Sequence, residues 1–350
     1  MVDTHLAPDW LTTAWLSDVL GEEVASMTVK RIGDGLVGMN LRLGLTYGDP
    51  DSSGPSTVVA KLPSPDPTSR ATGIALRNYE REVLFYRDLA HTVDIRVARC
   101  HHAEWDPESG DFDLLLEDLA PAAQGNQITG CTVDQARTAV VELARLHGPR
   151  WGDPALYDIE WLSRRTDEDI ERLQVLWGMF VPGFLGAYGS SLSAEGVALI
   201  EQFGSRIGDW INAREGDWTV THGDYRLDNL MFATAEGGYP VATVDWQSPG
   251  HGPASGDVSY FLGAGLVTPH RREVERGLVD AYGEALAGYG VEVTSDWLWE
   301  QYRRDAFAGV IMTVVASQIV GESDRSGAMF TAMATRHTQH ALDLDALSLC

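Results

Sequence analysis

The sequence predicts an α+β fold, with a smaller N-terminal lobe built on an antiparallel sheet and a helix, and a larger, mostly helical C-terminal lobe. Three observations support this prediction. β-branched runs between turn-forming residues occur in the first 120 residues, helical periodicity dominates the rest, and one polar hairpin lies among the predicted helices. The 350 residues suffice for one large or two medium domains. We expect the domains to be residues 1–118 and residues 119–350.

The first two predicted strands, 26–32 and 41–47, flank a glycine-rich segment. Its glycines Gly33, Gly35 and Gly38 have the spacing G-x-G-x-x-G, and such a hairpin can lay backbone N–H groups over phosphates. A glycine hairpin without a ligand explains the pattern equally well. The place of the segment, about 25 residues before Lys61, favours phosphate binding.

Lys61 ends a third strand-like run, 56–61. Only Lys30 and Lys61 are lysines among the 26 basic residues, so a lysine in an apolar strand needs a reason. A compact ammonium on a flexible stem can reach nucleotide phosphates from a strand, where a planar guanidinium would not fit. The alternative is a solvent-exposed lysine at a strand end.

Helical periodicity appears first at 70–89 and then recurs through the second part of the chain. Thr132 and Gln135 have the spacing of a capping box, and we expect His147, at the end of that helix, to be a buried structural histidine. The helices expected in the second part span 132–148, 166–181, 193–213, 257–266, 270–289, 295–320 and 325–347.

The motif H-G-D-x-x-x-x-N, with D-W following, is the most informative pattern in the chain. It contains Asp224, Asn229 and Asp245. In phosphoryl transfer, one Asp accepts the proton of the attacking hydroxyl, while an Asn and a second Asp hold the magnesium that bridges the nucleotide phosphates. An ordinary surface turn explains the H-G-D tripeptide alone, but it does not explain the full set.

The spacing of these residues indicates how they meet. A strand is expected from Asn229 to residue 234, a turn at 235–238, and a returning strand over 239–244. This hairpin would bring Asp245 back beside Asn229.

The motif resembles the aminoglycoside phosphotransferase family, and within it most closely the bacterial relatives of the ecdysteroid kinases. Protein kinases carry H-R-D and D-F-G at the corresponding positions, whereas here Gly223 replaces the Arg and Trp246 the Phe. The difference points away from protein substrates. The resemblance implies a two-lobed, protein-kinase-like fold with ATP and Mg²⁺ as cofactors.

The same resemblance assigns further residues. Lys61 would bind phosphates, and Glu82, which begins a match to E-x-x-F-Y, would pair with it, with Glu80 as the alternative. The linker around Glu117 and Leu119 would pass the adenine. Asp257 would brace the catalytic loop, although helix capping explains this residue as well.

Composition excludes several classes of partner. The net charge of −25 disfavours nucleic acid and anionic lipid. Residues 1–118 carry 20 acidic and 10 basic side chains, and residues 119–350 carry 31 and 16, so the excess does not indicate a polycationic substrate. The polar N-terminal residues do not resemble a signal peptide.

Membrane spans and disulfides are not expected either. The apolar stretch 306–320 is interrupted by polar residues, so it reads as a core helix. Three scattered cysteines, an odd number, fit reduced thiols and a cytoplasmic protein.

We therefore predict ATP-dependent phosphoryl transfer to a hydroxyl group of a small molecule. A nucleotide-binding pseudokinase is one alternative, but it would normally lack one of Lys61, Asp224, Asn229 and Asp245. A metal-dependent hydrolase is another; its ligands would be His222, Asp224, Asp245 and His251, and it would need no ATP. ATP or GTP preference and the oligomeric state stay open.

The acceptor is expected to be a lipophilic alcohol, with an aminoglycoside as the alternative. An aminoglycoside needs converging carboxylates, and the acidic run 167–171 lies at a helix start, where acids complement the dipole. Large apolar side chains suit a flat or lipophilic acceptor, although many could be core. They are Trp151, Trp161, Trp177, Phe180, Phe184, Trp297 and Trp299.

Overall fold

The computed structural model describes residues 7–33, 37–162, 166–214, 216–319 and 323–350. The chain divides into two compact units. The first unit comprises residues 1–91, 97–120 and 245–247, and the second comprises 92–96, 121–244 and 248–350. The main division between these units follows residue 120, and each unit also holds one short segment from the other side of that division. The domain bounds 1–118 and 119–350 stay predictions.

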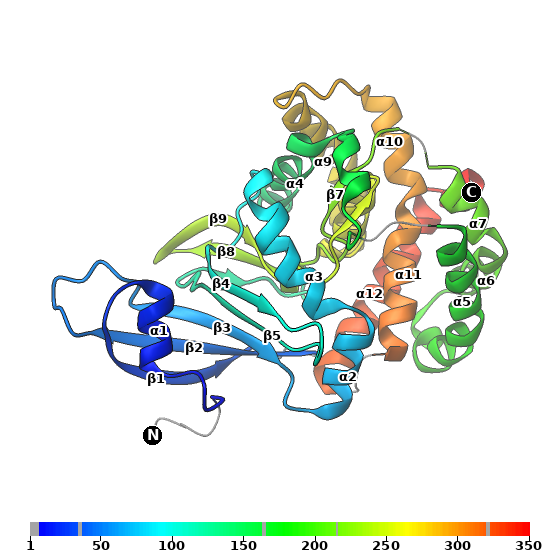
Figure 1. Cartoon of the computed structure of the whole chain (residues 1–350). Helices are drawn as coiled ribbons and strands as arrows, with labels where there is room; N and C mark the ends of the chain where they lie inside the picture. Colours follow the sequence, from blue (N-terminus) through cyan, green and yellow to red (C-terminus); the bar gives the residue numbers. More distant parts are fainter. Residues whose placement is uncertain (1–6, 34–36, 163–165, 215, 320–322) are drawn as a thin grey trace. The chain divides into compact units, whose positions relative to one another are not determined.

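The first unit is built on an antiparallel sheet with strand order β1-β2-β3-β5-β4 (Figure 1). Leu41, Val58 and Ala60 lie in its core, against which helix α1 (Thr13–Leu20) packs Leu16. Because side chains alternate along a strand, Lys61 lies on the opposite face from Ala60. The strands are β1 (Val24–Ile32), β2 (Gly38–Tyr47), β3 (Thr57–Pro63), β4 (Cys100–Trp105) and β5 (Phe112–Glu117).

The single helix expected at 70–89 is wrong: three shorter helices occupy this region. They are α2 (Pro67–Ala75), α3 (Asn78–Leu84) and a π-helix (Phe85–Leu89). Arg77 has φ 57°, a left-handed conformation that ends one helix before the next begins. The corner is tight, because a Cβ at Gly73 would lie 2.5 Å from the Tyr79 ring. Hydrophobic periodicity continues across this corner and conceals it.

Two small sheets of the second unit carry the motif residues. Strand β7 (Thr219–Thr221) pairs with β10 (Gly250–Gly252), and β8 (Leu230–Thr234) forms a hairpin with β9 (Gly237–Thr243), with β6 (Ala123–Gln124) on the far side of β8. The expected hairpin is present. Its turn is shorter than expected, since β9 begins at Gly237.

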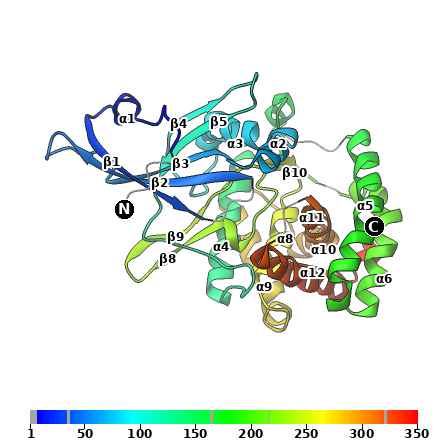
Figure 2. The same cartoon turned by 90° about the horizontal axis from the view of Figure 1, so that it is seen from below.

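Helices make up most of the second unit. Helix α11 packs against α8, α12 and α5 (Figures 1 and 2). The α-helices are α4 (Val133–His147), α5 (Asp167–Tyr188), α6 (Ala194–Phe203), α7 (Ile207–Asn212), α8 (Ser255–Gly265), α9 (Thr268–Ala287), α10 (Ser295–Arg304), α11 (Ala306–Ile319) and α12 (Asp324–Asp343).

Three expected helices have different limits. The helix expected to end at 181 continues through Pro182 to Tyr188. The helix at 193–213 is interrupted by a 3₁₀ turn, Gly204–Arg206. The helix at 295–320 breaks at buried Asp305, which accepts hydrogen bonds from Arg214 (2.7 Å) and Ser255 (2.5 Å). Contacts with distant residues, which local periodicity does not report, fix this break.

Candidate active site

In the first unit, the Lys61 ammonium lies between two carboxylates. Its Nζ is 2.6 Å from Glu82 Oε2 and 2.6 Å from Asp245 Oδ1. Lys61 is 8% exposed and Glu82 1%. The alternative partner, Glu80, instead forms an ion pair with Arg77 at 2.6 Å. Of the two glutamates considered from sequence, the structure therefore brings Glu82 to the lysine.

The backbone around Asp245 holds this arrangement. Asp245 has φ 67°, a left-handed conformation uncommon for a residue with a side chain, and such strain often accompanies functional positions. The next residue, Trp246, stacks on Phe85 of the π-helix with ring centroids 3.8 Å apart. The Trp246 N–H also donates to Glu82 Oε1 at 3.3 Å. Glu82 therefore bridges the lysine and the D-W motif.

Burial and charge act in opposite directions on the protonation of this cluster. Burial alone would lower the pKa of Lys61, but the Asp245 and Glu82 carboxylates outweigh it and raise the pKa above its usual value. Burial raises the pKa of Glu82, and the Lys61 charge opposes that shift. Lys61 is thus a permanent cation at neutral pH.

The other nucleotide-site residues expected from sequence lie along the same sheet. Gly33 ends the first strand region with φ 67°, Gly38 begins β2, and Gly35 lies outside the described residues. A Cβ at Gly38 would be 3.7 Å from Lys61 Cε, so this glycine borders the lysine stem. Glu117 is the last residue of β5, and half-buried Leu119 follows the strand.

In the second unit, Asp257 of helix α8 braces the loop 222–229, which carries the H-G-D motif. Its carboxylate accepts hydrogen bonds from the backbone N–H groups of His222 (2.6 Å) and Gly223 (2.9 Å). His147 Nε2 lies 3.3 Å away, and its Nδ1 lies 2.7 Å from the Tyr282 hydroxyl. His147 is fully buried, as expected of a structural histidine. Although burial would raise the pKa of Asp257, the hydrogen bond and charge of His147 lower it.

Gly223 is the residue at which this loop turns. Its φ is 79°, and a Cβ there would lie 2.2 Å from the carbonyl oxygen of Ser248. Any other residue would be strained in conformation and would also clash with backbone. The Gly in H-G-D is therefore a steric requirement of the loop.

Three side chains hold the Asp224 carboxylate. Tyr260 Oη donates to Oδ1 at 2.7 Å, Asn229 Nδ2 donates to Oδ2 at 2.9 Å, and Arg226 Nε lies 3.1 Å from both oxygens. Asp224 keeps 21% of its side chain exposed. A negative carboxylate fixed in orientation and still accessible is suited to accept a proton.

Asn229 links this loop to the hairpin. Its Nδ2 also donates to the Asp224 carbonyl oxygen (2.9 Å), and its own carbonyl accepts from Val244 N at 3.0 Å. Among the described residues, the Asn229 amide oxygen has no hydrogen-bond partner. An amide oxygen of this kind, like a carboxylate, is a ligand that Mg²⁺ accepts.

The sequence does not reveal one residue that contacts Asp224, and it leaves the role of another undecided. Tyr260 lies 36 residues after Asp224, and no local pattern relates the two. Arg226 lies inside the motif, and the sequence assigns it no role. Its Nη1 is 2.9 Å from Asp228, and Arg325 lies 3.3 Å from the same carboxylate. Although burial would lower the pKa of Arg226, Asp224 raises it. Arg226 therefore stays charged.

The geometry of the two histidines does not suit a metal-dependent hydrolase. His222 Nδ1 accepts the Asp224 N–H (3.2 Å), so its Nε2 donates to the Val244 carbonyl (3.1 Å), and both nitrogens are engaged. His251 packs between the rings of Tyr157 and Trp218.

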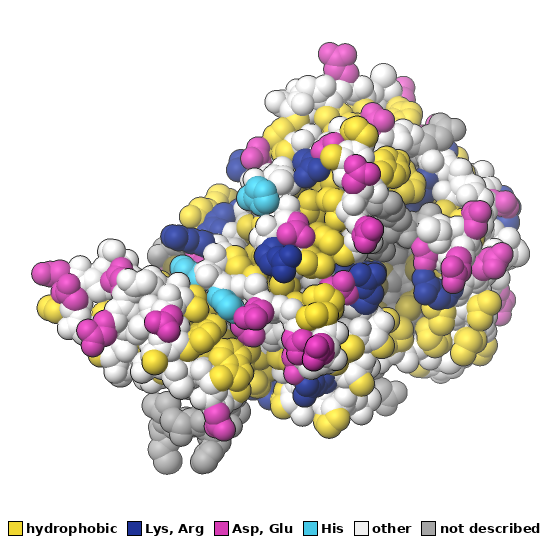
Figure 3. Space-filling model, in the orientation of Figure 1, with side chains coloured by type: hydrophobic (Ala, Val, Ile, Leu, Met, Phe, Trp, Pro, Cys, Tyr) yellow, Lys and Arg dark blue, Asp and Glu magenta, His cyan; other side chains and the backbone are white. Residues whose placement is uncertain are grey.

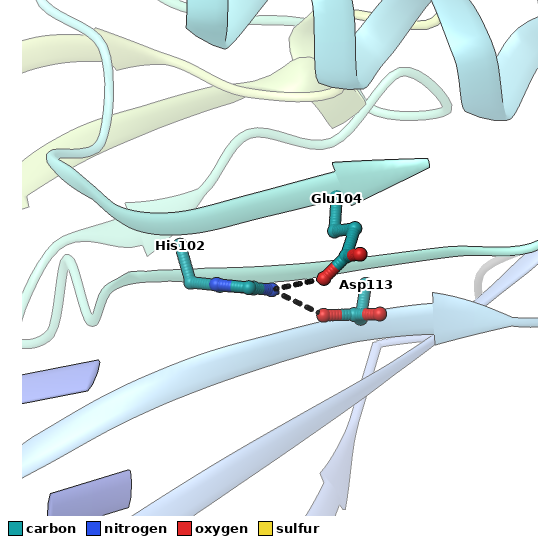
Figure 4. Close-up of side chains that lie close together, drawn as sticks. All are labelled: His102, Glu104 and Asp113. Carbon is teal, nitrogen blue, oxygen red and sulfur yellow. Dashed lines mark ion pairs between the residues drawn. The ribbon is translucent and has the colours of Figure 1, made fainter. Parts of the chain in front are cut away.

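Within the described ranges, one other group has metal-ligand spacing: His102, Glu104 and Asp113 (Figure 4). Glu104 and Asp113 lie directly opposite each other on β4 and β5, an unfavourable pair of like charges. His102 Nε2 lies 2.6 Å from Asp113, and this interaction raises the pKa of the imidazole. An ion pair that relieves the carboxylate repulsion explains the cluster.

Similarity to known proteins agrees with this geometry. Residues 75–292 match the phosphotransferase enzyme family, abbreviated APH. The chain belongs to this family. The match spans Glu82, Asp224, Asn229 and Asp245, and it confirms the resemblance and the prediction of a small-molecule kinase. No curated protein matches the sequence.

Several solved structures share the fold of this chain and so confirm it. A proposed aminoglycoside phosphotransferase from Ralstonia eutropha JMP134 is 17% identical with a TM-score of 0.55, covering 95% of this chain and 97% of its own. The GDP complex of aminoglycoside 2'-phosphotransferase-IIIa is 13% identical (TM-score 0.55; 91% and 94% covered). Choline kinase from Cryptosporidium parvum Iowa II is 10% identical (TM-score 0.55; 92% and 91% covered).

The surface of this phosphotransferase agrees with the even charge distribution seen in the sequence. Acidic side chains are scattered over both units on the face shown in Figure 3. In the described part of the chain, no helix has the length and apolar character needed to cross a bilayer.

Proposed function

We propose that this protein transfers the γ-phosphoryl group of ATP to a hydroxyl group of a small molecule with substantial apolar surface. The observation that carries the proposal is the Asp224 carboxylate, held by Tyr260, Asn229 and Arg226. In this role Asp224 accepts the proton of the acceptor hydroxyl as its oxygen attacks the γ-phosphorus. The bond between the γ-phosphorus and the bridging oxygen breaks, and ADP leaves.

The residues of the first unit bind and orient the nucleotide in this proposal. Lys61 neutralises the α- and β-phosphates, and Glu82 keeps its ammonium in place. Gly33, Gly35 and Gly38 cover the phosphates, and backbone groups near Glu117 and Leu119 receive the adenine. The full set Lys61, Asp224, Asn229 and Asp245 disfavours a pseudokinase.

Asn229 and Asp245 are the proposed ligands of Mg²⁺. The unpartnered amide oxygen of Asn229 and the carboxylate of Asp245 are the oxygen donors that this ion prefers, so the residues fit the cofactor. When bound, Mg²⁺ neutralises charge on the β- and γ-phosphates.

The surroundings of Asp224 support an apolar acceptor. Tyr260 belongs to an apolar cluster with Met329, Phe330 and Met333. Phe330 also lines a hollow of about 490 Å³, within the usual range for ligand pockets. The support for an apolar acceptor comes from the Tyr260 cluster and not from the rest of this lining, which is mostly polar or small: Tyr188, Ser317, Ser323, Asp324, Ser326, Gly327 and Ala328.

The sequence offers several aromatic residues for acceptor binding, and they do not lie together in the structure. Phe184 contacts Tyr188, with ring centroids 5.4 Å apart, and so adjoins this hollow. Trp177 packs on Phe203, and Trp299 stacks on Tyr302, so these two belong to the helical core.

One residue of the acidic run 167–171 caps its helix. Asp169 accepts the Thr166 N–H at 3.0 Å in a capping box. Asp167, Glu168 and Glu171 are exposed, so this run does not by itself decide between the two acceptor classes. The closer relationship to bacterial ecdysteroid-kinase-like proteins and the cytoplasmic location stay predictions.

Two assays test the proposal. ADP release is measured with a panel of aromatic and aliphatic alcohols and with kanamycin, and products are identified by mass spectrometry. Asp224→Asn should reduce turnover at least 1,000-fold, an order-of-magnitude expectation, and should keep Mg-nucleotide binding, because base and metal ligand are separate roles.

Phe330→Ala should raise KM for the alcohol, while the exposed Val175→Ala serves as control. Turnover of kanamycin alone would refute the acceptor class, and an active Asp224→Asn would refute the base.

A further inference from the structure

Tyr260 occupies an unusual position on helix α8. It is 4% exposed, its hydroxyl donates to Asp224 Oδ1 at 2.7 Å, and its ring lies in the cluster with Met329, Phe330 and Met333. Burial and the Asp224 charge raise the pKa of Tyr260 well above its usual value. The hydroxyl therefore stays a donor at every pH at which an enzyme of this kind is assayed.

The Tyr260 ring is held from the other side by His337 of helix α12. The two rings stack with centroids 5.3 Å apart and planes 13° apart. His337 is 1% exposed, and neither of its ring nitrogens has a hydrogen-bond partner among the described residues. Burial, with nearby Arg336 and Arg271, lowers the pKa of His337 to about 3. The imidazole is therefore neutral at physiological pH.

Two glycines make room for this imidazole. A Cβ at Gly309 of α11 would lie 2.0 Å from His337 Nδ1, and a Cβ at Gly263 of α8 would lie 2.7 Å from the same atom. Burying two ring nitrogens without partners is unfavourable, and an apolar side chain would avoid the cost. The imidazole fills this slot and keeps an aromatic ring against Tyr260.

We propose that Tyr260 is a positioning residue for Asp224 and that His337 acts through it, by fixing the plane of the Tyr260 ring. The inference rests on the proposed role of Asp224 as base. Tyr260 then selects which carboxylate oxygen faces the acceptor hydroxyl, because Oδ1 is oriented toward the tyrosine donor. It also stabilises the ionised carboxylate before proton transfer.

The surroundings of Asp224 show which of its contacts one substitution can remove cleanly. Arg226 and Asn229 approach its carboxylate from its own loop, and Tyr260 approaches from α8. Asp228 takes the other end of Arg226, and Arg325 of α12 contacts Asp228. Tyr260 and Asn229 are the neutral donors, and of the two Tyr260 is the one that is not also a proposed metal ligand.

Tyr260→Phe tests the proposal, because it keeps the ring and deletes the hydroxyl. We expect kcat to fall about 30-fold, as for loss of one hydrogen bond to a charged group, with KM for the nucleotide unchanged. The fall should appear equally in kcat and in kcat/KM for the acceptor, because the lost interaction orients the base and does not bind the substrate. A purely structural role would lower the melting temperature and leave kcat of the folded enzyme unchanged.

Tyr302→Phe is the matched control. Its fully buried hydroxyl donates to the Glu275 carboxylate at 2.9 Å, away from the catalytic loop. It should lower the melting temperature as Tyr260→Phe does and leave kcat unchanged. Equal effects of both variants on kcat would overturn the proposal.

Variants of His337 separate stacking from acid–base chemistry. His337→Leu removes the ring and its unpartnered nitrogens, so we expect an unchanged or higher melting temperature with kcat about 5-fold lower. His337→Phe keeps a ring and should retain more activity than the Leu variant. Wild-type kcat in His337→Leu, or a Phe variant as slow as the Leu variant, would contradict its role. An active Asp224→Asn would instead remove the proposed function itself.

Discussion

Lys61 is one of two lysines in the chain, and its side chain is buried between Glu82 and Asp245, whereas Lys30 is exposed. At the scale of single residues, the site combines fixed charges with the donors that orient them. Lys61 has two carboxylate partners, and Asp224 has three donor side chains. Each of these two charged side chains is therefore held in place by several neighbours.

Replacing Lys61 tests the nucleotide half of the proposal. Lys61→Ala, and Lys61→Arg as well, should lower kcat/KM about 100-fold, because a guanidinium places its charge further out and in a plane. Glu82→Ala should have a smaller effect. Steady-state kinetics would measure this, with melting curves to check folding and Lys30→Ala as the control. Near wild-type kinetics in Lys61→Arg would contradict the assignment.

Asp257 provides a prediction about stability and pH. Asp257→Asn should lower the free energy of unfolding at pH 7 by about 3 kcal/mol, since buried N–H groups lose an ionised acceptor. A carboxyl whose pKa is lowered in the folded state contributes stability above its unfolded value, about 3.9, and loses it as pH falls through the folded value. The difference between wild type and variant should therefore shrink below about pH 4.

Denaturant titrations from pH 3 to pH 7 measure this difference. Asp296→Asn, at a side chain that is 99% exposed, provides the control. A gap that stays constant with pH would show that Asp257 is not an ionised brace.

At the scale of elements, the conformation of the loop 222–229 depends on strand β7, the β8–β9 hairpin and helix α8. Strand β7 delivers His222 and Gly223 to the Asp257 carboxylate, and the β8–β9 hairpin returns Val244 to the Asn229 carbonyl. Short strands thus place the two ends of the motif, and the helix fixes the turn between them.

Two glycines with the same backbone conformation test this turn. Gly223 and Gly290 have φ 79° and 77°, but a Cβ at Gly290 would meet nothing within 4 Å. Gly290→Ala should cost about 1 kcal/mol and leave activity intact. Gly223→Ala should cost at least twice as much and lower kcat more than about 100-fold, because the turn must move away from Ser248. Thermal melts and steady-state kinetics of both variants measure these effects. Equal losses of stability and of kcat in the two variants would mean that the clash with Ser248 is relieved by movement elsewhere.

At the scale of the whole molecule, nucleotide binding should stabilise the folded protein. A non-hydrolysable ATP analogue with Mg²⁺ at about 100 times its Kd should stabilise the folded protein by about 2.7 kcal/mol. The melting temperature should rise in wild type and in Asp224→Asn, and much less in Lys61→Ala and Asp245→Ala. The same titration with a GTP analogue establishes the nucleotide preference. A shift in Asp245→Ala equal to that of wild type would exclude Asp245 as a metal ligand.

The sequence by itself determined the family, the α+β class and the motif residues. The reason is that H-G-D-x-x-x-x-N and the hairpin after it are local patterns, in which chain geometry alone relates one residue to the next. The β-branched run before Lys61 likewise revealed its strand. Such local features do not depend on how the rest of the chain packs.

Only the tertiary structure decided the rest. The choice of Glu82 over Glu80, the break at Asp305, and the Tyr260 and His337 contacts depend on side chains distant in sequence. Periodicity measures which face of a helix is apolar, and it is blind to a corner such as Arg77, where the chain turns while the apolar pattern continues. Packing between elements, and not local preference, placed these residues.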